Sequence, residues 1–374
     1  MLPLVEKHVF DLKPYAPGKT FREARAEYGI QDFVKLASNE NCLGPSPRAV
    51  KAMHHAFSSV HMYPLEEIAN VEAKICEYHH AYQINPKNIV LGNGSNELIM
   101  LLVRVLLSRN EILLNAWPSF LMYRTAVKIH DRQELTVPLT PELKYDLKKM
   151  IEVSKGPLAE RLKLVFVCNP NNPTGSYVTQ AEIDDFMEQM PAHVVIVIDE
   201  AYAEYVMRSD YASAIDWVLK RPRTVVLRTF SKIFGLAGLR IGYGICDPEI
   251  ANSLHRVRDA FNVNCLAQEA AKGALDDVEH VQASREHNHR ELVKIYEGLR
   301  GLAIKTTESS GNFVLMHLND DMPETEKVIK KLLLQGIIVR GVANYDLPRS
   351  IRVTIGKPEE NQRFLSALSQ ILVK

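Results

Sequence analysis

The sequence has no net charge, few cysteines and no long apolar run, and each absence excludes a class of protein. Its 45 Lys and Arg residues balance 45 Asp and Glu residues, so nothing predicts a nucleic-acid partner or a polybasic membrane surface. The 5 cysteines are far apart and form no C-x-x-C pair, which argues against a disulfide framework or a structural zinc site. No apolar run approaches the ~18 residues of a membrane span, and the first residues lack a signal-peptide pattern. We therefore expect a cytoplasmic protein with no membrane partner.

The length of 374 residues predicts two domains, because a chain of this size exceeds one small core. From residue 89 onward, short β-branched apolar runs alternate with helix-like segments, which is typical of a parallel sheet covered on both faces. The runs are Ile89–Leu91, Ile112–Leu114, Leu164–Cys168, Val194–Ile198 and Thr224–Leu227. We therefore predict an α/β fold, with a three-layer αβα large domain and a mostly parallel sheet over residues 46–265.

The pattern changes after residue 265. Residues 266–300 predict one long connecting helix, and apolar runs at 312–316, 337–340 and 351–355 alternate with helices expected near 324–335 and 358–372. We expect residues 1–45 and 266–374 to form a smaller α+β domain that includes an N-terminal arm. Ser46 and Pro47 predict the cap and the first turn of the first helix of the large domain.

Polar and glycine residues gather where the predicted strands end. Ligands of parallel α/β sheets bind beyond the carboxyl ends of the strands. The residues at those ends are Gly92–Ser95, Phe120, Asn172, Asp199, Tyr202 and Lys232. The glycine turn before the helix at Leu98 presents free backbone N–H groups and a positive dipole to an anion, although the same residues also fit an ordinary tight turn.

Lys232 leaves the end of a predicted buried strand, which is a poor place for a simple surface charge. A lysine amine becomes nucleophilic when its surroundings lower its pKa, so we infer that Lys232 forms a Schiff base. Asp199 follows five apolar residues, and the ring N–H of a pyridoxal cofactor would supply the positive charge that stabilises such a carboxylate. Tyr202 and Asn172 could hydrogen-bond the ring oxygen of that cofactor.

The same edge offers groups for the ring face and for a phosphate. Phe120 could stack on the ring, while Gly94–Asn96, Thr229, Ser231 and Arg240 could hold the phosphate. Each residue alone also fits a structural role, such as a helix cap, a core aromatic or a surface ion pair. Those separate roles do not explain why all of them fall at strand ends.

Several motifs carry a resemblance that covers nearly the whole chain. They are Ser38–Asn41 with Gly44–Pro47, Tyr63-Pro64, Gly92–Glu97, Asn171–Gly175, Asp199–Tyr202, and Thr229–Lys232 with Gly238–Arg240. They resemble those of the fold-type I pyridoxal-phosphate aminotransferases and, more narrowly, those of the histidinol-phosphate aminotransferase family. The cofactor implied is pyridoxal 5'-phosphate.

The resemblance implies roles for individual residues. Lys232 would hold the cofactor covalently and move a proton, Asp199 would keep the ring nitrogen protonated, and Tyr202 would bind the ring oxygen. Cofactor contacts are also implied for Gly94, Ser95, Asn96, Phe120, Asn172, Thr229, Ser231 and Arg240. Tyr63 would reach the cofactor of a neighbouring subunit, which implies a homodimer with shared active sites. Tyr15, Asn39, Arg340 and Arg352 would bind substrate.

The expected reaction is transfer of the amino group from histidinol phosphate to 2-oxoglutarate in histidine biosynthesis. One substrate presents carboxylates and the other a phosphate, and a guanidinium fork suits both. Ala260 and Gly341 stand where the family commonly has proline. Two alternatives therefore stay open, namely an aromatic amino-acid aminotransferase and a pyridoxal-phosphate-dependent threonine-phosphate decarboxylase.

No metal site is expected. Neighbouring histidines occur at residues 54–55, 79–80 and 287–289, but none forms an H-E-x-x-H motif. Polar positions on helix surfaces explain these histidines better.

Overall fold

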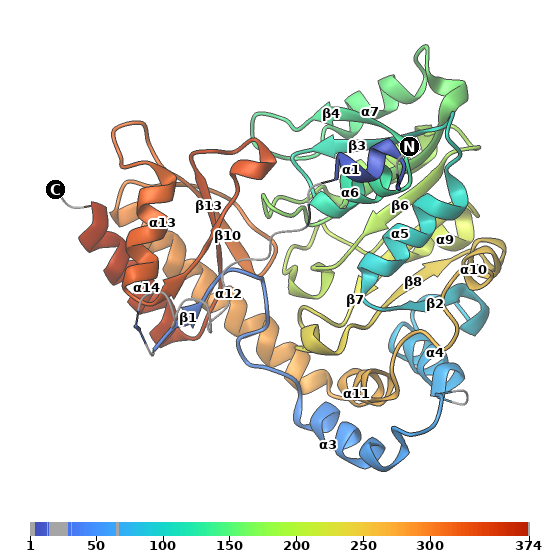
Figure 1. The fold of residues 1–374 in the computed structure, drawn as a ribbon, viewed down its shortest axis with the longest axis horizontal. Helices are drawn as coiled ribbons and strands as arrows, with labels where there is room; N and C mark the ends of the chain where they lie inside the picture. The colour runs from blue at the N-terminus through green and yellow to red at the C-terminus, as the bar shows by residue number, and fades with distance from the viewer. Residues whose placement is uncertain (1–3, 13, 15–28, 31, 65–66, 373–374) are drawn as a thin grey trace.

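The computed structural model describes residues 4–12, 14, 29–30, 32–64 and 67–372, and Tyr15 lies outside these ranges. Figure 1 shows a larger part, in which helices flank a sheet on both sides, and a smaller part that carries the C-terminus. No helix of the described residues has the length and apolar character needed to cross a membrane.

The larger part is built on a seven-stranded sheet. In spatial order its strands are β2 (Ile89–Gly92), β8 (Gly242–Cys246), β7 (Thr224–Thr229), β6 (Val195–Asp199), β5 (Leu162–Cys168), β3 (Ile112–Trp117) and β4 (Gln133–Pro138). β8 is antiparallel to both of its neighbours, whereas the other pairs are parallel. The mostly parallel sheet is thus as predicted. The edge strand β4 was not predicted, because its residues are largely exposed and form no apolar run.

Helices cover this sheet and fill the connections between its strands. They are α3 (Pro47–Ala56), α4 (Glu67–Tyr78), α5 (Ser95–Leu106), α6 (Leu121–Ile129), α7 (Leu147–Ser154), α8 (Gln180–Gln189), α9 (Ile215–Lys220), α10 (Pro248–His255) and α11 (Cys265–Leu275), with short 3-10 turns at Phe57–Ser59, Pro86–Asn88, Ala159–Arg161, Ala203–Tyr205 (η4) and Ala237–Leu239. The predicted cap of α3 is confirmed, since Ser46 Oγ accepts a hydrogen bond from the Ala49 N–H at 3.0 Å.

The smaller part contains a four-stranded antiparallel sheet in the order β12 (Arg340–Gly341), β13 (Ser350–Thr354), β10 (Phe313–His317) and β9 (Lys305–Thr307). Its helices are α12 (Val278–Gly301), α13 (Thr325–Leu334) and α14 (Pro358–Leu372), and a 3-10 turn spans Ala343–Tyr345. Near the start of the chain, β1 (Val34–Lys35) pairs in parallel with β11 (Ile337–Ile338), whereas the short helix α1 (Lys7–Phe10) lies against α6 in the larger part (Figure 1).

The single helix expected over residues 266–300 is wrong. The chain breaks at Asp276 and Asp277 into α11 and α12, and the Asp277 side chain accepts a hydrogen bond from the His280 N–H at 3.3 Å. An aspartate favours a helix N-terminus because its carboxylate satisfies a free backbone N–H there. The prediction missed this cap because the helix-like apolar pattern continues on both sides of the break.

Two main hydrophobic cores correspond to the two parts. The larger core runs from Ala49 to Val281 and also includes Phe313. The second core joins Val34 and Leu36 to apolar residues between 292 and 371. α11 contributes to the larger core, although the sequence placed the end of the large domain at residue 265.

Candidate active site

A cavity of about 260 Å³ opens at the edge where the parallel strands end. Because β2, β3, β5, β6 and β7 are parallel, their carboxyl ends share this edge, and the antiparallel β8 begins there. The predicted residues that line the cavity are Gly94, Ser95, Asn96, Phe120, Asn172, Asp199, Tyr202, Thr229, Ser231, Lys232 and Arg240. The unpredicted ones are Ser38, Glu40, Cys168, Ala201 and Ala237.

Asp199 is the last residue of β6 and its side chain is buried. Tyr123 donates its hydroxyl to Asp199 Oδ2 at 2.7 Å, and the Ala201 N–H donates to Oδ1 at 3.2 Å. Burial raises the pKa of Asp199 to about 6, while the hydrogen bond from Tyr123 acts in the opposite direction. This carboxylate would therefore be stabilised by a cation placed in the cavity.

Sequence reasoning missed Tyr123. It lies in α6, one turn after Phe120, and looks like an ordinary core residue in the sequence. The two rings meet edge to face, with centroids 5.6 Å apart. The only sequence signal is the i, i+3 spacing from a residue already assigned to the site.

Lys232 is half-buried, with its amine facing the cavity. Nζ donates to the Ser38 carbonyl at 3.2 Å and lies 5.6 Å from the centre of the Tyr202 ring. Loss of hydration and the charge of Arg352 lower the pKa of Lys232 to about 7. Much of the amine is then neutral near pH 7, which is the state that a nucleophile requires.

The other end of the cavity forms a group that we call the phosphate cradle: Gly94, Ser95, Asn96, Ser231 and Arg240. Ser95 begins α5, so backbone N–H groups of the first helical turn are available to an anion. Arg240 Nη1 lies 3.4 Å from Ser231 Oγ and donates to the Ala237 carbonyl at 2.9 Å.

Two details of the phosphate cradle fit an anionic group. Gly94 has φ of +76°, and a Cβ there would lie 2.5 Å from Arg240 Nη2, so only glycine lets the guanidinium come this close. Asn96 Oδ1 is buried without a hydrogen-bond partner among the described residues. Turning this amide over would present its NH₂ donors in place of the unpaired oxygen.

Residues of the smaller part reach the cavity wall through Tyr202 and Asn172. Asn39 donates from Nδ2 to the Tyr202 hydroxyl at 2.9 Å and accepts from Thr354 Oγ1 at 3.2 Å. Arg352 donates to Asn172 Oδ1 at 2.5 Å. Arg352 is thus one contact away from the cavity without lining it.

The remaining predicted residues are not part of the cavity lining. Tyr63 is 70% exposed and stacks on Phe261 with ring centroids 4.3 Å apart. Arg340 is half-buried and lies opposite Arg352 in the pairing of β12 with β13. Tyr15 lies outside the described residues.

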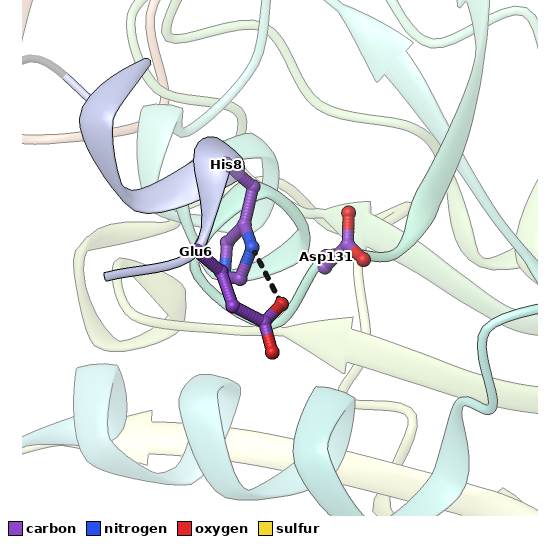
Figure 2. Close-up of side chains that lie close together, drawn as sticks. All are labelled: Glu6, His8 and Asp131. Carbon is purple, nitrogen blue, oxygen red and sulfur yellow. Dashed lines mark ion pairs between the residues drawn. The ribbon is translucent and has the colours of Figure 1, made fainter. Parts of the chain in front are cut away.

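A separate group of potential metal ligands lies near α1. Figure 2 shows Glu6, His8 and Asp131 close together, with an ion pair of 3.4 Å between His8 Nδ1 and Glu6 Oε2. Arg109 lies 3.6 Å from a carboxylate oxygen of both Glu6 and Asp131. The guanidinium already balances these exposed carboxylates, so we interpret the group as a surface ion-pair cluster.

Comparison with known proteins agrees with this geometry. Residues 31–368 match the family described as aminotransferase class I and II. The chain is 42% identical to a histidinol-phosphate aminotransferase of Anaeromyxobacter sp. (strain Fw109-5), over 99% of this chain and 100% of the relative. It is 38% identical to that of Moorella thermoacetica, over 99% and 94%.

The fold is also that of solved aminotransferases. The crystal structure of histidinol-phosphate aminotransferase from Sinorhizobium meliloti in complex with pyridoxal-5'-phosphate has a TM-score of 0.89 and 24% identity, over 99% of this chain and 98% of that one. The predicted fold-type I architecture is thereby confirmed. This protein therefore belongs to the class I and II aminotransferases.

Proposed function

We propose that this aminotransferase uses pyridoxal 5'-phosphate to transfer the amino group of histidinol phosphate to 2-oxoglutarate, a step of histidine biosynthesis. The observation that carries the proposal is one cavity with a buried acid, a lysine of lowered pKa and a phosphate cradle. The narrower substrate assignment is supported by the names of the relatives reported above.

The residues of the cavity fit the cofactor from end to end. Arg240, Ser231 and the first turn of α5 would hold its phosphate, and Phe120 would pack on its ring. Asp199 would pair with the protonated ring nitrogen, whose charge offsets the cost of burying the carboxylate. When bound, the cofactor supplies an electron-withdrawing ring that stabilises the negative charge left at the substrate Cα.

Lys232 would carry out the proton transfer. Its neutral amine would accept the proton from the substrate Cα and release that proton again later in the reaction. The pKa of about 7 suits this role, since an amine that titrates near the working pH both accepts and releases protons. Tyr202 and Asn172 would orient the ring through hydrogen bonds to its oxygen.

The substrate anion would be bound from the smaller part. Arg352 is buried and held by Asn172 and by the Ala37 carbonyl at 3.0 Å. Its Nε has no partner among the described residues. A planar guanidinium can donate paired hydrogen bonds to either a carboxylate or a phosphate. Arg340, Asn39 and Tyr15 would add further substrate contacts.

We also propose two domains that meet at this cavity, within a cytoplasmic homodimer. Phe57, Val60, Met62, Tyr63 and Phe261 expose between 40% and 70% of their surface. Exposed apolar side chains gathered in this way mark a protein interface. Tyr63 would reach the cofactor of the partner subunit from there, and measurement of the mass in solution tests the dimer.

The cofactor proposal is tested with Lys232→Ala. This variant should lose the absorbance band of the lysine-bound cofactor and almost all turnover, whereas Lys149→Ala, an exposed lysine paired with Glu152, should keep both. A variant of Lys232 that retains the band and full turnover would contradict the proposal.

The substrate is tested by comparing kcat/KM for histidinol phosphate, phenylalanine and threonine phosphate, each with 2-oxoglutarate. We expect a clear preference for histidinol phosphate. A preference for phenylalanine would make the protein an aromatic aminotransferase. Release of carbon dioxide from threonine phosphate would make it a decarboxylase.

A further inference from the structure

A group of three buried charges lies directly behind the cavity. Arg228 Nη2 forms an ion pair with Glu200 Oε2 at 2.7 Å, and Nη1 donates a hydrogen bond to Glu204 Oε1 at 2.6 Å. The side chains of Arg228, Glu200 and Glu204 are 7%, 1% and 5% exposed. Charges so deeply buried are rare unless they are paired, and each one is costly when it loses its partner.

The positions of these residues in the chain give the group its significance. Glu200 directly follows Asp199, and Glu204 lies in the η4 turn that follows Tyr202. Arg228 directly precedes Thr229, at the end of β7. The guanidinium therefore joins two segments, residues 199–204 and 228–232, which carry Asp199 and Lys232 to the cavity.

Further hydrogen bonds fix the same two segments. Ser213 Oγ donates to Glu200 Oε2 at 2.7 Å and accepts from Arg228 Nη2 at 3.0 Å. From α12, Arg285 Nε donates to the Glu204 carbonyl at 2.5 Å. The guanidinium contacts one carboxylate with each of its two Nη groups, whereas a lysine has a single amine and would not match this geometry.

Arg228 also contributes to the electrostatic environment of Asp199. The other titratable groups that face it are His79, Tyr78, Tyr82, Tyr211 and Tyr243. Burial and the charge of Arg228 lower the pKa of His79 to about 3, and burial raises the pKa of the tyrosines. The charged side chains in contact here are Arg228, Glu200 and Glu204, with Arg285 on the Glu204 carbonyl. Burial is the main cause of the raised pKa of Asp199, and the charge of Glu200 raises it further; Arg228 forms an ion pair with that glutamate.

We propose that Arg228 is a positioning residue of the aminotransfer reaction. By bridging Glu200 and Glu204, it holds the segment of Asp199 against the segment of Lys232 and balances the charge beside the acid. The inference rests on the proposed function, since it assigns Arg228 to the placement of groups that contact the cofactor.

The test compares variants of the holoenzyme in kcat, KM and the pH midpoint of the cofactor absorbance. Arg228→Met should lower kcat by about 100-fold with little change in KM, because small displacements of reacting groups cost about this much. It should also raise the midpoint, since loss of a positive charge favours bound protons. Arg228→Lys should lower kcat but keep the midpoint, because it retains the charge without the fork.

Glu200→Gln and Arg221→Met complete the set. Glu200→Gln keeps the size of the side chain, removes one negative charge and should lower the midpoint, opposite to Arg228→Met. Arg221 precedes the other end of β7 and donates to the Pro191 and Val194 carbonyls at 2.8 Å, so its loss should change neither kcat nor the midpoint. If Arg228→Met does not fold, Arg228→Lys and Glu200→Gln decide the question.

The outcomes separate this inference from the proposed function. A wild-type protein without the absorbance band refutes the cofactor and this inference with it. A wild-type protein with the band and with turnover upholds the function. In that case, the positioning role of Arg228 is overturned by an unchanged kcat in Arg228→Lys, by an unchanged kcat and midpoint in Arg228→Met, or by an equal loss of kcat in Arg221→Met.

Discussion

Replacing Asp199 by asparagine should stabilise the cofactor-free protein at neutral and alkaline pH while removing most of its activity. Asp199 is buried and ends a strand, and its pKa rises from 3.8 to about 6 mainly because burial disfavours the charged form. Asparagine has the same shape and never ionises. Without a cofactor to pair with, the ionised Asp199 carboxylate destabilises the folded protein, and an amide at this position avoids that cost.

The size of the effect follows from the two pKa values. The folded state binds the proton more tightly than the unfolded state, so the contribution is favourable at low pH and is lost as pH rises through about 6. Ionisation of Asp199 costs about 2 kcal/mol of stability at pH 5 and about 3 kcal/mol at pH 8. The amide cannot accept hydrogen bonds from both Tyr123 and Ala201, which costs about 1–2 kcal/mol at every pH.

The pH dependence separates these two contributions. Chemical denaturation of cofactor-free wild type and Asp199→Asn should give free energies of unfolding whose difference grows by about 1 kcal/mol in favour of the variant from pH 5 to pH 8. Asp216→Asn, an exposed position in α9, is the matched control and should match the wild type. A difference between Asp199→Asn and wild type that stays constant over this range would refute the reasoning.

The same variant should be a poor enzyme. With cofactor bound, the amide offers no negative charge to the ring nitrogen, so kcat should fall by about 100-fold or more. Steady-state kinetics measures this loss. Near-normal turnover would remove Asp199 from its assigned role, whatever the denaturation data give.

Three further substitutions test the rest of the site. Tyr123→Phe removes the 2.7 Å hydrogen bond to Asp199, which should raise the pKa of the acid further. Since a hydrogen bond to a charged group contributes about 1.5–3 kcal/mol, kcat should fall about 10-fold. Unchanged kinetics would contradict this expectation. Gly94→Ala places a Cβ 2.5 Å from the guanidinium of the phosphate cradle. Absorbance titration of this variant should therefore show an affinity for the cofactor about 10-fold weaker than that of the wild type. Gly238 has open space around it, so Gly238→Ala should bind the cofactor normally. Arg352→Lys keeps the charge but loses the fork, so KM for both substrates should rise about 10-fold with a smaller change in kcat; an unaltered KM would exclude this residue from substrate binding.

Most of the strand-end chemistry was predictable from the sequence. Apolar runs mark the strands, and the helices between them predict parallel neighbours, so Asn172, Asp199 and Lys232 were expected at one edge. The glycine turn at Gly94 was also predictable, because the residues of the turn and of the helix start that follows it are contiguous in the chain. The prediction of one helix over residues 266–300 was wrong because the apolar periodicity was given more weight than the capping residue Asp277.

What the sequence by itself determined, then, is the alternation of most strands and helices and the set of groups at one sheet edge, since both depend on near neighbours in the chain. Only the tertiary structure decided the partners of those groups. Tyr123 lies 76 positions from Asp199, and Asn39 lies 163 positions from Tyr202. Such contacts depend on packing between distant segments, and packing leaves no local pattern. The bridge of Arg228 to Glu200 and Glu204 belongs to the same class, because buried charges are placed by the three-dimensional arrangement of their partners.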